Sequence, residues 1–394
     1  MRERMLYLSA QNHGPEGEIE EEARTEGMIG ILLERFDIDL LEYCSYGRKT
    51  ELRPDPALKI HSVTPARRPH ILLKGSLNKL RGSAYHTDTH RGLQNEIRSL
   101  CKFNDYSHVF INRGVPGSCV DLISSLLPEA VIITDVLHPE SRQSEGKAAG
   151  KRGLSRRYHM LNAALSRRDE RRLMNKTGLL LTASEWEALS FKALSFADAG
   201  KVHVVPQFID LEEYQFSESA VKEEAIVLHW NMQTSQGKNA ALTFHKRVFP
   251  LIKDKVPGCK CYIIGEEIHP EVTALAKQDS SVQIVKESGA VQEYIRRSKV
   301  VVASMREGCG GQLRILEAWA LRTPVVTGLK SAEGLTCEPG RNILLAGTTG
   351  EMAEQVLKLL QTPELGPIIA DQAYKTLQKH YEASNVRSKV LSLV

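Results

Sequence analysis

The stretch from Lys299 to Gly328 limits most strongly what this chain can fold into. It begins with a β-branched apolar run, continues through a loop with three glycines and a helical pattern, and ends in a second short apolar run. Apolar runs of this kind are typical of strands that are buried on both faces of a parallel sheet. The stretch therefore predicts a strand, glycine loop, helix and strand unit of an α/β protein.

The glycine loop and the helix after it form a candidate anion site. Glycines let a ligand approach bare backbone, and the first turn of a helix carries unpaired N–H groups. Gln312, Arg314 and Glu317 fall on or near the first turns. Arg314 can bind phosphate oxygens, and Glu317, on the same helical face, can accept hydrogen bonds from sugar hydroxyls. The alternative is a helix start with an exposed Arg and Glu, since glycine loops before helices are common.

Strand and helix patterns alternate along both halves of the chain. In the first half, strands are expected at residues 5–10, 37–43, 59–63, 108–112, 130–134, 178–183 and 201–206. After a linker at residues 206–210 the alternation restarts, with strands at 225–230, 259–265 and 282–286 and helices at 239–253, 270–278 and 291–298. Ser184, with Glu187 three residues later, predicts a capping box at the start of a helix.

This alternation and the length of the chain predict two domains. A chain of 394 residues exceeds what one hydrophobic core usually supports. We expect doubly wound Rossmann-like domains at residues 1–207 and 208–366, followed by a C-terminal helical segment at 367–394 that packs back toward the N-terminal domain.

The carboxyl ends of the first-half strands hold further candidate residues, because open α/β sheets bind ligands at that edge. A turn that ends at Gly17 follows the first strand, and Asp135 and His138 follow the strand at residues 130–134. Either of these two could accept a proton or orient a hydroxyl. A plain surface turn and a structural Asp that caps the next segment are the alternatives, and the sequence leaves both open.

Several other protein classes are disfavoured by motif and composition. The loop before Gln312 lacks the third glycine of the dinucleotide fingerprint, and the chain contains neither a Walker sequence nor HExxH. The seven Cys are scattered without a CxxC pair, so we expect reduced packing residues without zinc or disulfide. No apolar run is long enough for a membrane span, and the apolar run near the N-terminus, Leu6 to Leu8, is too short for a signal peptide. We therefore expect the protein in the cytoplasm.

Positive charge is concentrated between Arg142 and Lys176. This segment has eleven Lys or Arg against three acidic residues, which gives it a charge of about +8. One interpretation is a solvated charged face. The other is attraction to an anionic membrane surface or to an acceptor that carries phosphate. Nucleic acid is not expected as a partner, because the cluster lacks interleaved aromatic residues for base stacking and matches no known finger or helix-turn-helix spacing.

The second half of the chain resembles a known family. The segments that carry the resemblance are 226–231, 238–242, 249–252, 256–257, 262–265, 312–320, 324–326 and 331–335. Together they are similar to the nucleotide-sugar domain of family-four-like GT-B glycosyltransferases, and most of all to a bacterial exopolysaccharide subgroup. The resemblance covers residues 226–381 well and the first half in outline. It implies a GT-B fold, in which two Rossmann-like domains face a central cleft.

The resemblance also implies roles for individual residues. Glu317 would bind the ribose of a nucleotide sugar, and Arg314 and the Gly310 and Gly311 amides would bind its diphosphate. Further donor-side positions are Gly17, Lys238, Glu287 and Gln312. The catalytic positions would be Glu307, near the donor sugar, with Asp135 and His138 in the first half. The family has seven residues between its two glutamates, whereas Glu307 and Glu317 are separated by nine, with Cys309 at the expected place.

The function implied is transfer of a hexosyl group from a nucleotide sugar to an acceptor hydroxyl in polysaccharide biosynthesis. The acceptor would be a saccharide, a lipid-linked molecule or a small molecule. The resemblance implies retention of configuration without a metal or other cofactor, whereas inversion would make Asp135 or His138 the general base. The alternatives are a GT-B-like protein that binds a sugar nucleotide without catalysis, and a GT-B epimerase.

Overall fold

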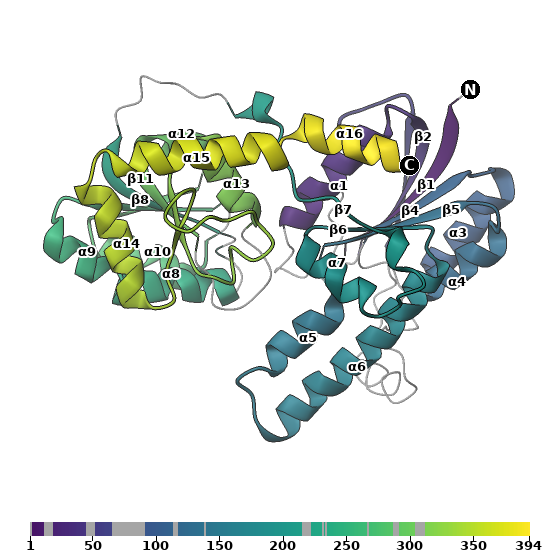
Figure 1. Cartoon of the computed structure of the whole chain (residues 1–394), viewed down its shortest axis with the longest axis horizontal. Helices are drawn as coiled ribbons and strands as arrows, with labels where there is room; N and C mark the ends of the chain where they lie inside the picture. The colour runs from purple at the N-terminus through teal and green to yellow at the C-terminus, as the bar shows by residue number, and fades with distance from the viewer. Residues whose placement is uncertain are drawn as a thin grey trace. The chain divides into compact units, whose positions relative to one another are not determined.

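The protein consists of two compact units, each built around a parallel β-sheet (Figure 1). The computed structural model describes residues 2–11, 19–44, 52–64, 91–112, 117–137, 139–214, 222–230, 232, 235–265, 268–286, 291–303 and 312–394. Within these ranges, unit 1 contains residues 2–11, 21–205 and 390–394, and unit 2 contains residues 19–20 and 206–389.

Unit 1 has a seven-stranded sheet in the order β3-β2-β1-β4-β5-β6-β7. Its strands are β1 (Glu3–Gln11), β2 (Phe36–Cys44), β3 (Leu58–Val63), β4 (His108–Asn112), β5 (Val131–Val136), β6 (Leu179–Thr182) and β7 (Val202–Val204). Its helices are α1 (Ile19–Leu32), α3 (Arg91–Phe103), α4 (Gly117–Leu126), α5 (Glu140–Ala148), α6 (Gly153–Lys176), α7 (Glu185–Lys192) and the short 3-10 helix η1 (Ala199–Lys201). All strand pairs are parallel, and the strand order reverses between β1 and β4.

The central strands of unit 1 are buried on both faces. On β1, Met5, Leu6, Tyr7 and Leu8 are fully buried. Tyr7 stacks on Phe110 of the neighbouring strand β4, with ring centroids 4.6 Å apart. Continuous apolar strands of this kind are what a doubly wound sheet requires.

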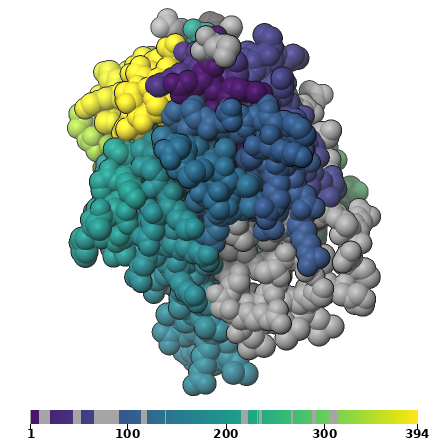
Figure 2. Space-filling view, turned by 90° about the vertical axis from the view of Figure 1, so that its right-hand side faces the viewer, coloured from purple at the N-terminus to yellow at the C-terminus, as the bar shows by residue number. Residues whose placement is uncertain are grey.

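A hairpin of two helices, α5 and α6, extends beyond the rest of unit 1 (Figure 1; Figure 2). The sequence pattern predicts a helix only from about residue 158, whereas α6 begins at Gly153 and runs for 24 residues. Its first turn contains Leu154, an exposed apolar residue.

Unit 2 has a six-stranded parallel sheet in the order β10-β9-β8-β11-β12-β13. The strands are β8 (Glu223–His229), β9 (Lys260–Ile264), β10 (Val282–Val285), β11 (Ser298–Val302), β12 (Val325–Thr327) and β13 (Leu344–Leu345). The helices are η2 (Leu211–Glu213), α8 (Ser235–Arg247), α9 (Phe249–Lys255), α10 (Pro270–Thr273), α11 (Leu275–Gln278), α12 (Val291–Arg297), α13 (Gln312–Ala320), α14 (Thr349–Gln361), α15 (Leu365–His380) and α16 (Ala383–Leu393). The strand order reverses between β8 and β11, which are hydrogen-bonded neighbours.

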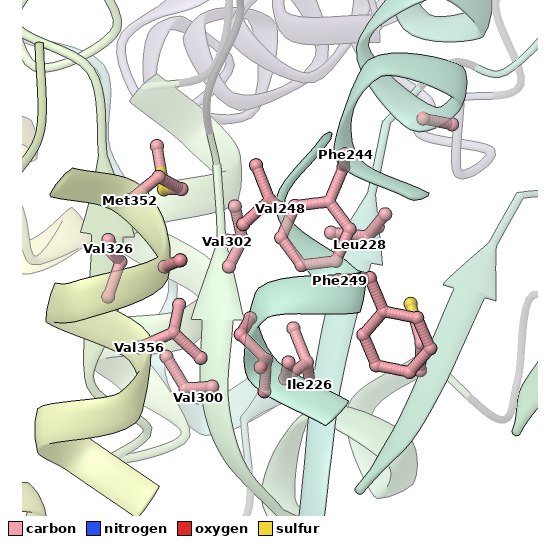
Figure 3. Packing of buried hydrophobic residues seen from close by; sticks show 14 of the residues in the cluster. Ile226, Leu228, Phe244, Val248, Phe249, Val300, Val302, Val326, Met352 and Val356 are labelled. Atoms are coloured by element: carbon pink, nitrogen blue, oxygen red, sulfur yellow. The ribbon is translucent and has the colours of Figure 1, made fainter. Parts of the chain in front are cut away.

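One apolar core holds unit 2 together. Side chains of β8 and β11 meet those of α8, α9 and α14, as Figure 3 shows for Leu228, Val302, Phe244, Phe249 and Val356. Burial of one such aliphatic side chain contributes about 2 kcal/mol. The two doubly wound α/β sheets predicted from the sequence are confirmed by these two sheets.

Two helices expected from the sequence are interrupted. The expected helix at 239–253 is two helices, α8 and α9, because Pro250 in the first turn of α9 has no N–H to continue the hydrogen bonds of α8. The expected helix at 270–278 is likewise divided into α10 and α11 at Ala274. Among the described helices, none combines the length and the apolar character needed to cross a bilayer.

Candidate functional site

The most developed polar cluster of unit 2 lies where its strand order reverses. Parallel strands end at one edge of a sheet, and ligands of doubly wound proteins bind at that edge beside the reversal. His229 is the last residue of β8, and α13 is the first helix after the neighbouring strand β11. Contacts between His229 and α13 place the first turns of this helix at that edge.

Helix α13 is buried on almost every side. Of its nine residues, seven are buried, and Arg314 and Glu317 are the two that retain partial exposure. Trp319, which is fully buried, is the largest side chain that fixes the helix against the core. The helix thus presents one narrow polar face, which consists of a guanidinium and a carboxylate three residues apart.

Arg314 and Glu317 form an ion pair on this face. The Arg314 Nη1 lies 3.1 Å from Oε1 and 3.0 Å from Oε2 of Glu317. Their side chains are 11% and 13% exposed, so solvent screens the pair much less than a surface pair. The pair keeps the carboxylate in one orientation.

Tyr214, which follows η2, donates a hydrogen bond from its hydroxyl to Oε1 of Glu317 at 3.4 Å. The Gln292 amide on α12 donates to the Glu213 carbonyl at 3.0 Å and so holds the segment that carries this tyrosine. Burial raises the pKa of Tyr214, and the negative charge of Glu317 raises it further. Tyr214 therefore stays protonated and can only donate to the carboxylate.

His229 approaches Glu317 from the end of β8. Its Nδ1 is 3.6 Å from Oε2 of Glu317, which is too long for a hydrogen bond. Burial lowers the pKa of His229 well below its ordinary value, and the positive charge of Arg314 lowers it further. The imidazole is therefore neutral at pH 7, and its buried Nδ1 has no hydrogen-bond partner among the described residues.

Gln312 and Lys238 occupy the same edge of the sheet. Gln312, the first residue of α13, donates from Nε2 to the Glu333 carbonyl at 2.7 Å, which ties the helix start to the segment after β12. Lys238 lies in the first turns of α8, the helix after β8, and its Nζ is 3.0 Å from Glu271. Because the Glu271 side chain is 58% exposed, this pair is weak, and Lys238 can exchange it for a ligand at little cost.

Six predicted site residues lie outside the described residues. They are Gly17, His138, Glu287, Glu307, Gly310 and Gly311. Of the predicted positions in unit 2, the structure therefore brings Lys238, Gln312, Arg314 and Glu317 to one edge of one sheet.

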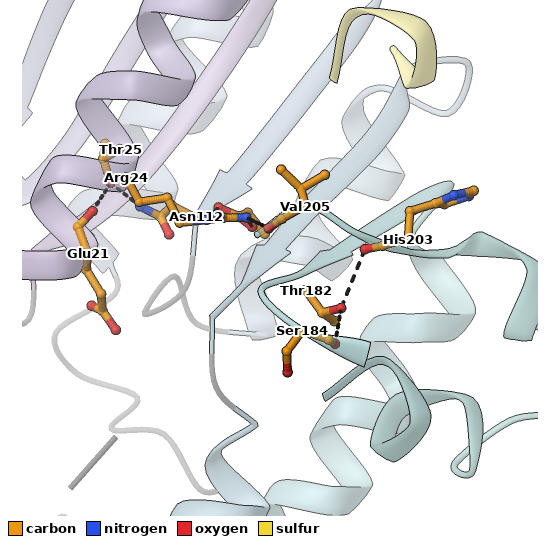
Figure 4. A network of polar contacts seen from close by, with 9 residues as sticks. Glu21, Arg24, Thr25, Asn112, Thr182, Ser184, His203 and Val205 are labelled. Carbon is orange, nitrogen blue, oxygen red and sulfur yellow. Dashed lines mark hydrogen bonds and ion pairs between the residues drawn. The ribbon is translucent and has the colours of Figure 1, made fainter. Parts of the chain in front are cut away.

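In unit 1, Asp135 belongs to a buried ion pair with Arg24 of α1. The Arg24 Nε and Nη2 donate to the two carboxylate oxygens at 2.7 Å each, and Nη2 also donates to the Val205 carbonyl at 2.9 Å. Nearby, the Asn112 amide at the end of β4 donates to the Thr25 hydroxyl (Figure 4). The Arg24 and Asp135 side chains are 1% and 2% exposed.

This geometry favours a structural role for Asp135. Both of its oxygens already accept charge-assisted hydrogen bonds, and removal of one partner from such a buried pair costs about 3–5 kcal/mol. If Asp135 accepted a proton from the substrate, Arg24 would lose its charged partner. Asp135 therefore binds α1. It does not cap the next helix, because the N-cap of α5 is Pro139 and has no side-chain hydrogen bond.

The two sheets define a recognisable fold. In overall structure the chain is similar to Anabaena HepE in complex with UDP-glucose, with 13% identity, a TM-score of 0.62, and 99% of this chain and 100% of that chain covered. It is also similar to the sucrose-phosphate synthase from Thermosynechococcus elongatus, with 11% identity, a TM-score of 0.71, and 99% and 98% of the two chains covered. A third similar structure is a variant of S. aureus TarM in complex with Fondaparinux, α-GlcNAc-glycerol and UDP, with 13% identity, a TM-score of 0.65, and 100% and 99% covered. The chain therefore has the GT-B fold.

The sequence of unit 2 matches one family model. Residues 226–362 match glycosyl transferases group 1. No curated protein sequence matches the chain. The resemblance to GT-B glycosyltransferases drawn from the sequence is confirmed by this match and by the fold.

Three residues of the polar clusters were not found from the sequence. His229 ends an apolar run, and a histidine at the carboxyl end of an expected strand is a signal that could have identified it. Tyr214 follows the linker, where no pattern distinguishes it. Arg24 lies in α1, and its partner Asp135 is 111 positions away.

Proposed function

We propose that the protein is a glycosyltransferase that moves a hexosyl group from a nucleoside diphosphate sugar to an acceptor hydroxyl. The observation that carries the proposal is the Arg314–Glu317 pair, exposed as the one polar face of a buried helix beside the strand reversal of unit 2. A carboxylate and a guanidinium three residues apart suit a ligand that has both a ribose and a diphosphate.

Glu317 is the proposed ribose ligand. Its two oxygens accept from Arg314 and Tyr214, and lone pairs remain for the two adjacent hydroxyls of a ribose. Because these partners already orient the carboxylate, ribose binding costs little further ordering of this side chain.

Arg314 and Lys238 are the proposed diphosphate ligands. When the glycosidic bond of the donor breaks, negative charge develops on the diphosphate, and these two cations stabilise it. Charge stabilisation by side chains is the reason why we propose transfer without a metal or other cofactor. We also propose that the reaction retains the anomeric configuration, that Glu307 acts near the donor sugar and His138 on the acceptor side, and that the protein is cytoplasmic.

Calorimetric titration of Glu317→Ala with UDP, GDP, ADP and dTDP tests the donor site. Loss of a hydrogen bond to a charged group costs about 1.5–3 kcal/mol, so we expect affinity for the preferred nucleotide to fall by about one to two decades. Arg314→Ala should weaken binding of the nucleoside diphosphate while binding of the bare nucleoside changes little.

Glu338→Ala is the matched control. Glu338 pairs with Arg341 at the same three-residue spacing in the same unit, but its side chain is 52% exposed and lies outside the site. This variant should bind the nucleotide as the wild type does, and circular dichroism should show that all variants are folded at the temperature of the titration. If Glu317→Ala also retains wild-type affinity, the donor-site assignment is wrong.

Turnover distinguishes transfer from the two alternatives. Incubation of the wild type with the preferred sugar nucleotide and EDTA should release nucleoside diphosphate, and NMR of the sugar product should show retained anomeric configuration. Tight binding without release would indicate a non-catalytic binding protein. A changed sugar that is still attached to the nucleotide would indicate an epimerase.

A further inference from the structure

The outer face of α6 has a stripe of exposed apolar side chains. Leu154, Tyr158 and Leu161 are 83%, 48% and 55% exposed, and their spacing of four and three residues places them on one side of the helix. The buried residues of α6 are Ala163, Ser166 and Met174. Ala163 is nine residues after Leu154, which is half a turn away around the helix, so the stripe points away from the packed side.

This stripe lies on the hairpin that extends beyond the rest of unit 1 (Figure 1; Figure 2). Helix α6 packs against α5, α4 and α7. These neighbours cover the buried side of α6, whereas Leu154, Tyr158 and Leu161 remain exposed. Three large apolar side chains in a row on an open face are unfavourable in water, which indicates that something covers them.

Basic residues flank the stripe. Arg157 lies three residues after Leu154, and Arg168 lies seven residues after Leu161, so both are beside the apolar side chains. Arg157 and Arg168 are exposed, and no ion pair of either is found among the described residues. In contrast, Arg167 pairs with Glu145, and Arg172 and Lys176 pair with Asp121, so the paired cations belong mainly to the second half of α6.

We propose that this face of α6 docks on an anionic lipid bilayer. Arginines beside an apolar stripe match the two layers of such a surface, since lipid headgroups carry the negative charge and the acyl region receives Leu154 and Leu161. Tyr158, which lies between them, has the amphipathic ring that suits the boundary between these layers. A basic face would repel a second copy of itself, so charge complementarity favours lipid over self-association.

The proposal predicts which variants lose membrane binding. The full-length protein should sediment with phosphatidylcholine vesicles that contain phosphatidylglycerol, and added salt should release it. Each basic residue near an anionic surface is worth about fivefold in affinity, so the double variant Arg157→Gln, Arg168→Gln should bind at least about tenfold more weakly. Leu154→Ser with Leu161→Ser should also weaken binding by about tenfold or more, with little change in the salt dependence.

Matched variants in unit 2 separate this face from general charge and hydrophobicity. Lys246→Gln, Arg247→Gln removes the same charge from exposed positions, and Ile368→Ser removes an apolar side chain that is 60% exposed. Both should bind the vesicles as the wild type does. Nucleotide affinity should be unchanged in all of these variants, because none of them alters a proposed donor-site residue. Failure of the membrane proposal can therefore be distinguished from failure of the proposed function.

Three results would overturn the proposal. Equal binding to vesicles of phosphatidylcholine alone would show that charge does not matter. Wild-type vesicle binding by the two α6 variants would place the contact elsewhere. A wild-type dimer in sedimentation velocity that Leu154→Ser with Leu161→Ser dissociates, without vesicle binding by either protein, would assign the face to a second copy of the chain.

Discussion

Glu317 has three polar neighbours among the described residues of unit 2. Arg314 of the same helix forms an ion pair with it, the Tyr214 hydroxyl donates a hydrogen bond to it, and the neutral imidazole of His229 lies 3.6 Å from it. The first of these partners follows from the three-residue spacing in the sequence, because helical geometry places such residues side by side. The other two come from positions 103 and 88 residues away, and only the tertiary structure brings them together.

His229 makes the stability of the protein depend on pH. Burial, and then the charge of Arg314, lower its pKa in the folded state, whereas in the unfolded chain it protonates near pH 6.5. Below that pH the unfolded state binds a proton that the folded state does not, so the free energy of unfolding should fall by up to about 1.4 kcal/mol per pH unit. Between pH 7.5 and pH 5.5, the melting temperature should fall less for His229→Gln than for the wild type.

Arg314→Gln is a second variant for this measurement. It keeps the histidine buried but removes the nearby charge that opposes protonation. Its acid destabilisation should therefore lie between those of the wild type and His229→Gln. An unchanged pH dependence in His229→Gln would mean that this histidine does not titrate as its surroundings indicate.

At the scale of helices, the local sequence predicts where several helices begin, but it does not predict where a helix is interrupted. The capping box predicted at Ser184 is confirmed, since the Ser184 hydroxyl accepts from the Glu187 N–H and donates to its carboxylate. The same pattern begins α14, where Thr348 accepts from the Glu351 N–H and Glu351 accepts from the Gly347 N–H. The division of α10 from α11 has no equally local signal, because Ala274 is a good helix former.

Ser184→Ala should destabilise unit 1 by about 1 kcal/mol. The substitution removes the N-cap acceptor of α7 and leaves Glu187, which is 8% exposed, without its hydroxyl partner. Urea denaturation monitored by circular dichroism would measure this loss. Ser190→Ala on the exposed side of the same helix is the control and should change the free energy of unfolding by less than about 0.5 kcal/mol, and an equally small effect of Ser184→Ala would contradict the capping role.

At the scale of the whole molecule, the periodic alternation of strand and helix predicted both sheets, because the burial of parallel strands leaves long apolar runs in the sequence. The strand orders, in which each sheet reverses beside its first strand, are not encoded in any single segment. The same holds for the buried Arg24–Asp135 pair. Asp135 has the position of a substrate residue in the sequence, at the end of a central strand, and only the fold shows that α1 supplies an arginine to it.

The placement of the donor-site residues in unit 2 predicts that a nucleoside diphosphate protects the two units unequally. A ligand present at one hundred times its Kd stabilises the structure that binds it by about 2.7 kcal/mol, which slows exchange of amides that require unfolding of that structure by about a hundredfold. Hydrogen exchange measured by mass spectrometry should therefore slow in β8, β12 and α13, while β1, β4 and β5 of unit 1 exchange as before. Glu317→Ala at the same nucleotide concentration should show little protection anywhere. Equal protection of β4 and α13 in the wild type would mean that unit 1 contributes as much to nucleotide binding as unit 2, and the assignment of the donor site to Arg314 and Glu317 alone would fail.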